Sequence, residues 1–211
     1  MHWVPCRRPE RICVSNFVKK GEHICVPLCF NVGDVMCECL LRQMKTDEFD
    51  EVYKLLECSF PPDERRDYAG QRALLEESGY CIYVTDDDKV SGFLAVWQLG
   101  NRAFVEHFAV HPDTRGQGLG SKMLTALRKK LGCPLCLEAE LPLTDIAVRR
   151  IAFYERNGFF VNEYPYEQPP FAADKKAVPL YVLTTDGKLS PERFEALRRQ
   201  IYKTVYKREI N

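Results

Sequence analysis

The 211-residue sequence lacks an excess of charge of either sign, because 30 lysine and arginine residues balance 30 aspartate and glutamate residues. This balance gives no indication of a nucleic-acid partner or of an anionic membrane surface. The sequence also lacks an apolar run of the ~18–20 residues that a membrane span needs. Its amino terminus lacks the shorter apolar run of a secretory leader. We therefore expect a cytoplasmic protein with no nucleic-acid and no membrane partner.

Cysteine, by contrast, is abundant, with ten residues. Without a secretory route, we expect these cysteines to be reduced thiols. Cys133 and Cys136 have the spacing of a redox motif or of half a zinc site, but a zinc site needs a second pair, and Cys37 and Cys39 stand too close together. We therefore expect no metal. Cys136 and Cys81 fall in strand-like patterns and are expected to be buried, which argues against a covalent acyl-enzyme.

The chain divides into three parts by its hydrophobic pattern. Residues 1–35 show no sustained period of 2 or 3.6 and are assigned no fold. We expect the main domain at 36–187 and a C-terminal helix within 188–211. Gly33 and Asp34 can be encoded by a purine-rich stretch that suits a ribosome-binding site, so one hypothesis is that translation starts at Met36. A genuine cysteine-rich extension is the competing interpretation.

Periodicity and turn residues predict the order of helices and strands. The first half reads as an antiparallel meander, and the second half alternates helix and strand, which is typical of the α/β (α+β) class. The expected strands are 37–44, 81–85, 90–99, 103–110, 135–140, 159–163 and 180–184. The expected helices begin at Thr46 and cover about 71–77, 118–131, 145–157 and 191–207.

The most informative segment is the glycine-rich loop at 115–121, which lies between a predicted strand and a predicted helix. Alternating glycines allow several backbone N–H groups to point toward one place, and the positive end of the following helix adds to their effect. Such a loop is suited to phosphate oxygens. We therefore predict a pyrophosphate-binding site here.

Two well-known phosphate loops fit this segment poorly. A Walker loop requires lysine before its serine or threonine, whereas here Ser121 precedes Lys122, and the four-residue gap between glycines is missing. The dinucleotide-binding fingerprint requires its third glycine one residue later, near the start of a βαβ unit, and here a meander precedes the loop. The kinase-type interpretation fails and the dinucleotide interpretation is weak.

The loop does resemble the acetyl-CoA loop of the GNAT superfamily of N-acetyltransferases, Arg/Gln-x-x-Gly-x-Gly/Ala after a strand that ends in Val-x-Pro. Arg115, Gly118 and Gly120 stand at its defining positions. A second segment, 149–159, resembles the family's Tyr-Glu-Lys/Arg-x-Gly-Phe helix end. The resemblance is of the bacterial type and covers about 36–184. It implies a GNAT-like fold, in which helices flank a mixed, mostly antiparallel sheet.

The resemblance also implies direct transfer of an acetyl group from acetyl-CoA to a primary amine. Strands that splay around Val110 and Leu135 would admit the cosubstrate. The family's asparagine seven positions before the tyrosine is Ala147 here, so its pantetheine contact is not carried over. The residues that the resemblance assigns to acetyl-CoA binding are Phe108, Val110, Arg115, Gly116, Gln117, Gly118, Leu119, Gly120 and Ser121.

For the chemistry, the family motif places Tyr154 beside the sulfur, where a phenol of ordinary pKa ~10 can protonate the leaving thiolate. Glu106 is the candidate base. Strand alternation puts it on the face of Phe104, Phe108 and Val110, and puts His107 on the opposite face.

His107 and His111, which lies in the Val-x-Pro turn, are therefore expected to be bystanders. Glu138, in the neighbouring strand, is the alternative base, or it forms with Glu140 a negative wall that attracts a cationic amine.

The acceptor amine is left open. Peptide amines, small metabolites and antibiotics all remain candidates, and the pocket is expected in the variable segments 60–78 and 164–174. A homodimer through the last strand and the helix at Ser190 also stays open. The alternative function is a CoA-binding regulatory or interaction module that has lost catalysis.

Overall fold

The computed structural model describes residues 40–85 and 89–209. Its eight described strands form one mixed sheet in which only β4 and β5 pair in parallel. The spatial order is β1 (Leu41–Gln43), β2 (Tyr80–Thr85), β3 (Gly92–Leu99), β4 (Arg102–Val110), β5 (Leu135–Glu140), β8 (Val178–Thr184) and β6 (Phe160–Asn162), with β7 (Glu167–Gln168) paired to β8. The predicted mixed, mostly antiparallel sheet is confirmed.

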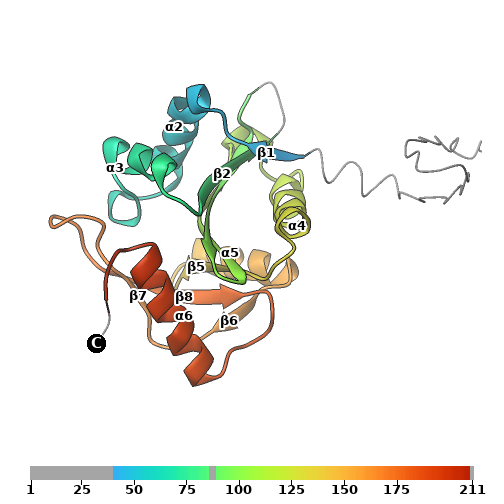
Figure 1. Ribbon diagram of the computed structural model, residues 1–211. Coiled ribbons are helices and arrows are strands. Elements are labelled where there is room, and N and C mark those ends of the chain that lie inside the picture. The colour runs from blue at the N-terminus through green and yellow to red at the C-terminus, as the bar shows by residue number, and fades with distance from the viewer. Residues whose placement is uncertain (1–39, 86–88, 210–211) are drawn as a thin grey trace, which may run out of the picture.

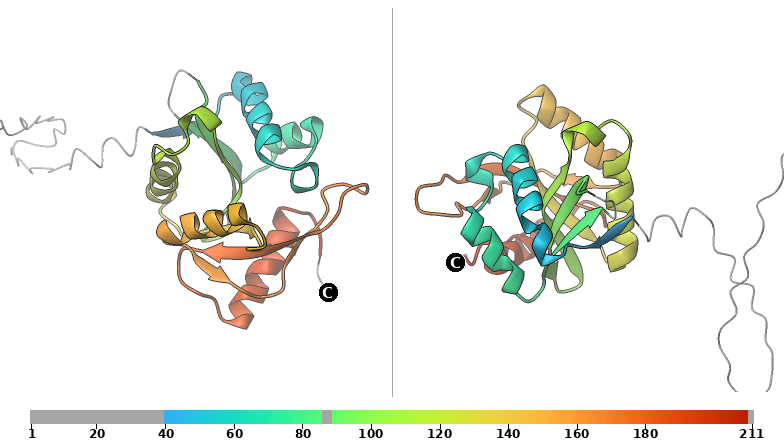
Figure 2. Two further views of the ribbon diagram at one scale, coloured as in Figure 1. Left: turned by 180° about the vertical axis from the view of Figure 1, so that it is seen from behind. Right: turned by 90° about the horizontal axis from the view of Figure 1, so that it is seen from above.

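Helices cover both faces of this sheet, as Figures 1 and 2 show. One face carries α2 (Phe49–Ser59), α3 (Tyr68–Ala73) and α6 (Pro191–Thr204), and the other carries α4 (Leu119–Leu131) and α5 (Asp145–Arg156). Each face has its own cluster of buried apolar side chains. All the predicted helices are present, with three differences at their ends. The helix expected from Thr46 opens as a 3-10 turn at 46–48, the one expected at 71–77 begins earlier and ends as a 3-10 turn at 74–76, and the last ends at Thr204 rather than at 207.

The C-terminal helix α6 shows why these elements form. The Ser190 side chain accepts a hydrogen bond from the backbone N–H of Arg193, three residues later, and so caps the helix. Its apolar side chains recur every three to four residues and lie in the core of the first face. These side chains are Phe194, Leu197, Ile201 and Val205. The prediction that this stripe packs in the core is confirmed.

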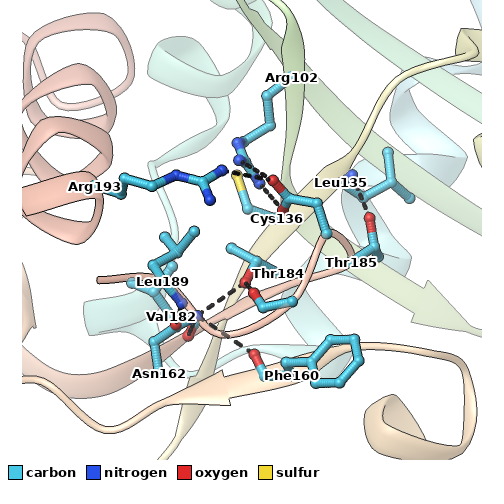
Figure 3. A network of polar contacts seen from close by, with 12 residues as sticks. Arg102, Leu135, Cys136, Phe160, Asn162, Val182, Thr184, Thr185, Leu189 and Arg193 are labelled. Atoms are coloured by element: carbon cyan, nitrogen blue, oxygen red, sulfur yellow. Dashed lines mark hydrogen bonds and ion pairs between the residues drawn. The ribbon is translucent and has the colours of Figure 1, made fainter. Parts of the chain in front are cut away.

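A buried amide ties α6 to the sheet, as Figure 3 shows. The Asn162 Nδ2 of β6 donates to the backbone oxygen of Val182 at 3.0 Å and to Thr184 Oγ1 at 2.9 Å, both in β8. Its Oδ1 accepts a hydrogen bond of 2.8 Å from the Leu189 N–H, just before α6. Because Asn162 is only 2% exposed, its amide fixes the chain entering α6 to these two strands.

The parallel pair β4 and β5 is short, and this determines where the sheet opens. Ala103 pairs with Leu135, and Val105 pairs with Leu137, after which no further pairing joins the two strands. The expected splay at Val110 is therefore present, but Leu135 lies in the paired part. The fork begins one residue beyond Leu137 because the pairing stops there.

Several predictions fall outside the described residues or need correction. The extension 1–35, the proposed start at Met36 and residues 37–39 of the first predicted strand lie outside them. Cys136 is buried as expected, but Cys81 is only half-buried because β2 leaves that side chain partly open. Within the described ranges, none of the helices is long and apolar enough to cross a membrane.

Candidate active site

The fork between β4 and β5 opens into a cleft of about 680 Å³. It is walled by the second half of β4, the glycine loop with the start of α4, the end of β5, and α5. The end of α2 and the loop that follows it close the other side. One continuous space therefore reaches from the glycine loop to Glu106, Glu138 and Tyr154.

The glycine loop adopts a backbone that requires glycine at two positions. Gly116 has φ +78° and Gly118 has φ +76°, in the left-handed region, and an added Cβ at either would point into open space. At Gly120 an added Cβ would lie 3.3 Å from the ring of Phe108 and 3.2 Å from the ring of Phe153. The first two glycines shape an open cradle, and the third lets α4 pack closely.

The start of α4 supplies hydrogen-bond donors to this cradle. The Lys122 N–H donates to the Gly118 oxygen at 3.1 Å, as the first bond of the helix. The N–H groups of residues 119–121 precede it and have no partner within the helix, and the helix dipole is positive at this end. The loop thus fits a phosphate group, as the sequence predicts. Arg115 folds back, and its Nε donates to the Val110 oxygen at 3.0 Å.

The outer edge of β4 presents its backbone to the fork at the two residues that the sequence predicts. The Ala103 N–H points toward β5, where it donates to the Pro134 oxygen, and the His111 N–H points toward β3, where it donates to the Ser91 oxygen. Ladder groups alternate along a strand, so the backbone groups of Phe108 and Val110 face away from β3. They line the cleft.

A β-bulge in β4 overturns the predicted side-chain faces. Ala95 pairs with His107 and Val96 pairs with Val105, so Glu106 is an extra residue on β4. Alternation therefore shifts by one residue at this point. Phe104 stays with Glu106 on the face of the first core cluster, whereas Phe108 packs with the second.

The same bulge brings the side chains of Glu106 and His107, which were predicted to lie on opposite faces, close together. His107 Nδ1 lies 3.7 Å from Glu106 Oε2, so the prediction that these side chains point to opposite faces is wrong. His107 Nε2 lies 3.0 Å from the backbone carbonyl oxygen of Glu64 and must donate to it, because a carbonyl oxygen only accepts. Burial lowers the pKa of His107. Its Nδ1 is buried and finds no hydrogen-bond partner in the described chain. His111 is exposed in the turn.

The side chain of Glu106 is buried, and both of its carboxylate oxygens accept hydrogen bonds. Oε1 accepts from an Arg66 guanidinium nitrogen at 2.5 Å, and Oε2 accepts from Trp97 Nε1 at 3.2 Å. The Glu106 side chain is only 2% exposed, and that of Arg66 is 12% exposed. Both oxygens of Glu106 are therefore held by donors of the protein, one of them a cation.

Glu138 faces the cleft from the opposite arm of the fork and has no cation among its hydrogen-bond partners in the described chain. The Tyr166 hydroxyl donates to Oε1, and the Tyr206 hydroxyl donates to Oε2 at 2.6 Å. Burial raises the pKa of Glu138 to about 7, with the two tyrosine hydrogen bonds acting in the opposite direction and the charges of Glu106 and Glu64 acting with burial. A carboxylate with such a pKa can exchange a proton near neutral pH.

Two further carboxylates complete this wall of the cleft. Glu140 follows Glu138 on the same side of β5 and pairs with Arg150 of α5 at 2.7 Å. Burial and the nearby charge of Glu140 raise the pKa of Glu64. Together with Glu106 and Glu138, four carboxylates line the cleft.

Tyr154 lies on α5 at the opposite wall of the cleft, buried against Phe153 and Phe159. Burial raises the pKa of its phenol to about 12. Ala147 lies in the same helix, seven residues before Tyr154, and is buried. Its backbone N–H donates to the Thr144 side chain that caps α5. In the described ranges, no group of three or more histidine, cysteine, aspartate or glutamate side chains is arranged to hold a metal ion.

Sequence reasoning missed four residues of this site. Glu64 and Arg66 lie in the loop after α2, Tyr166 lies before β7, and Tyr206 follows α6. The segments 60–78 and 164–174 were expected at the acceptor pocket, but no spacing links a residue in them to Glu106 or Glu138. Tyr206 carries no signal of its own, because it only adjoins the apolar stripe of α6.

Comparison with known proteins agrees with this geometry. A family model described as the acetyltransferase (GNAT) domain matches residues 77–160. The Bacillus subtilis (strain 168) protein YjbC, which is named as an acetyltransferase, is 37% identical to this chain over 111 residues. That match covers 51% of this chain and 55% of YjbC, so it spans about half the length of this relative.

Solved structures extend the likeness to most of the described chain. A GNAT-family structure from Bacteroides thetaiotaomicron is 32% identical with a TM-score of 0.73, and the match covers 80% of this chain and 99% of that one. A Bacillus subtilis acetyltransferase solved in complex with CoA is 17% identical with a TM-score of 0.50, covers 72% and 99% of the two chains, and shares the fold. By the identity and coverage of the Bacteroides relative, together with the matched domain, this chain belongs to the GNAT family of acetyltransferases.

Proposed function

We propose that this protein transfers an acetyl group from acetyl-CoA directly to a primary amine. The observation that carries the proposal is the single cleft that joins the glycine loop to Glu138 and Tyr154. A cosubstrate with a pyrophosphate at the loop and a thioester beyond it would run along β4 toward both side chains. Because Gly116 and Gly118 leave the cradle open, a phosphate group can approach the backbone there.

In the proposed reaction, the amine nitrogen attacks the thioester carbonyl, a C–N bond forms and the C–S bond breaks. The proton lost by the amine passes to Glu138, directly or through a water molecule. Glu138 suits this role better than Glu106, because a guanidinium pairs with Glu106 at 2.5 Å whereas only hydroxyls hold Glu138. Its pKa of about 7 also matches a base that works near neutral pH.

Tyr154 would assist the leaving thiolate. With a pKa of about 12, its phenol stays protonated at any working pH and remains a hydrogen-bond donor. Full proton transfer to a thiolate of ordinary pKa about 8.5 is uphill at this pKa. We therefore assign Tyr154 a hydrogen bond to the sulfur as negative charge develops, with the final proton coming from solvent.

The acceptor is proposed to arrive as an ammonium. Four carboxylates line the cleft, and the cations that pair with them are Arg66, at Glu106, and Arg150, at Glu140. The wall is therefore negative when Glu64 and Glu138 are ionised, and it attracts a cation. The ammonium would lose its first proton to water, which makes the nitrogen nucleophilic, and Glu138 would take the second proton as the C–N bond forms.

The direct test is titration calorimetry with acetyl-CoA, followed by thiol release across a panel of primary amines. We expect binding, and turnover on at least one cationic amine. Binding without turnover on a broad panel would favour a CoA-binding regulatory module instead. Absence of binding would refute the proposal.

Tyr154→Phe sharpens this test. Since the hydroxyl makes no hydrogen bond within the described chain, the variant should fold normally and bind acetyl-CoA like the wild type. We expect kcat to fall about 100-fold, at the lower end of what one hydrogen-bond donor to a developing negative charge contributes. Equal losses in binding and turnover would show that Tyr154 only packs against its neighbours.

A further inference from the structure

Two tyrosine hydroxyls from distant segments hold the carboxylate of Glu138, one on each oxygen. Tyr166 lies 28 residues away in sequence and binds Oε1. Tyr206 lies 68 residues away and binds Oε2 at 2.6 Å. Both phenols are buried, and a phenol bound to a carboxylate must be the donor. A carboxylate held at both oxygens cannot rotate freely, so its remaining lone pairs point in fixed directions.

Tyr206 is brought to Glu138 by an anchored chain end. Immediately before it, the Val205 oxygen accepts a hydrogen bond of 2.9 Å from Arg66, the residue that also pairs with Glu106. Immediately after it, the Lys207 ammonium pairs with Glu77 at 3.0 Å and lies over the ring of Trp97. The segment 205–207 is thus fixed on both sides of Tyr206.

Tyr166 is fixed by a different set of contacts. Its backbone oxygen accepts a hydrogen bond of 3.1 Å from the Leu180 N–H of β8. Its ring meets the rings of Phe194 and Tyr202 edge to face, and both belong to α6. The same helix therefore supports both tyrosines that hold Glu138.

We propose that Tyr166 and Tyr206 are positioning residues that orient the Glu138 carboxylate toward the acceptor amine, so that α6 and the segment after it take part in acetyl transfer. The inference rests on the function proposed above. It assigns no direct contact with the substrate to either tyrosine. Their effect is exerted through Glu138.

The charged and titratable groups around Glu138 give the sign of the expected effect. Glu106, paired with Arg66, faces Glu138 from β4, and Glu64 faces it from the loop after α2. Tyr202 lies near Glu138 on α6, and Cys136 lies two residues before it on β5.

Burial and the two glutamates favour the protonated acid, whereas the two tyrosine hydrogen bonds favour the carboxylate. Removing one hydroxyl should therefore raise the pKa of Glu138.

Tyr206→Phe and Tyr166→Phe keep the rings and remove one donor each. Because a base must be deprotonated to act, the acidic limb of the pH profile of kcat/KM should move to higher pH, by about one unit per hydroxyl. At pH 6 this shift gives about a 10-fold loss, and at pH 9 the rate should return to within about 3-fold of wild type. A purely structural role would lower the rate equally at every pH.

Tyr202→Phe is the matched control. Tyr202 lies on the same helix and in the same aromatic cluster, but its hydroxyl donates to the backbone oxygen of Glu167 rather than to Glu138. The acidic limb of the kcat/KM profile of Tyr202→Phe should coincide with that of the wild type. Using one amine throughout makes the ionisation of the substrate common to all profiles. Glu138→Gln should remove the contribution of Glu138 to the limb and leave only that of the amine.

A second measurement separates this inference from the function it rests on. NMR titration of the ¹³C-labelled glutamate carboxyls, with Glu138 assigned from Glu138→Gln, reports its pKa in each variant without requiring turnover. Movement of both the NMR pKa and the kinetic limb in the two Phe variants supports the inference. An unchanged pKa and limb in active variants would overturn it while leaving acetyl transfer intact. An enzyme without turnover would refute the proposed function and the inference with it, whatever the NMR pKa.

Discussion

The two ends of the cleft are built in opposite ways. The cofactor end, where we propose that acetyl-CoA binds, is one continuous segment, 115–121, which includes the start of α4. The acceptor end, where we propose that the amine binds, is assembled from β4, β5, the loop after α2, the segment before β7 and the chain after α6. A contiguous site depends on local backbone conformation, whereas an assembled site depends on which distant side chains the fold brings into contact. Substitutions at the two ends should therefore fail in different ways.

The largest loss of cosubstrate affinity is expected at the cofactor end with Gly118→Asp. The new side chain would occupy a left-handed backbone position and place a negative charge where phosphate is expected. Affinity for acetyl-CoA, measured by calorimetry, should fall about 1,000-fold, which corresponds to about 4 kcal/mol. Gly132→Asp is the control, because Gly132 ends the same helix with φ +61° and open space around it. Equal loss of binding in both variants would show that general strain in α4 is responsible.

At the acceptor end, Arg66→Gln should act on folding rather than on the cofactor. It leaves the carboxylate of Glu106, only 2% exposed, without its cation. Removing one partner of a buried pair costs about 3–5 kcal/mol. Urea denaturation should show a loss of this order. Arg193→Gln, which breaks a pair whose arginine is 61% exposed, should cost at most about 1 kcal/mol. If the two variants lose equal stability, the acceptor end does not depend on this ion pair.

The smallest effect is a pH dependence of stability that comes from Glu138. Its pKa of about 7 in the folded state lies above the ordinary 4.5, so between these values the folded protein holds a proton that the unfolded chain releases. Stability contributed by this group is therefore present below about pH 4.5 and is lost as the pH rises through 7.

Glu138→Gln does not titrate, so its stability relative to wild type should rise by about 1–3 kcal/mol between pH 4.5 and 8. Urea denaturation at several pH values measures this difference. Glu167→Gln, at an exposed position, should show no such trend. A flat difference for Glu138→Gln would mean that its carboxyl titrates normally in the folded protein, contrary to the assignment of Glu138 as the base.

The β4 bulge shows how far strand patterns carry a prediction. Counting alternate residues along 103–110 placed Glu106 and His107 on opposite faces. One extra residue at Glu106 brings their side chains within 3.7 Å. The pattern of apolar residues tolerates such a bulge, because residues on both faces of β4 are buried. Only the pairing with β3 reveals it.

The two candidate bases show the same limit. Glu106 and Glu138 are both strand carboxylates in sequence, and residue spacing did not separate their roles. Arg66, 40 residues from Glu106, accounts for the difference between them by neutralising one carboxylate. The two tyrosines hold the other without neutralising it.

The sequence by itself determined the order of the elements, the mixed sheet class and the position of the glycine loop between β4 and α4. These features depend on hydrophobic periodicity and on glycines within a few residues of one another. They can be predicted from the sequence because they follow from local backbone conformation. The tertiary structure alone gave the two carboxylates different surroundings, on which the proposal of Glu138 as the base rests. A pKa depends on burial and on neighbouring charges and donors, and here those neighbours come from up to 68 residues away.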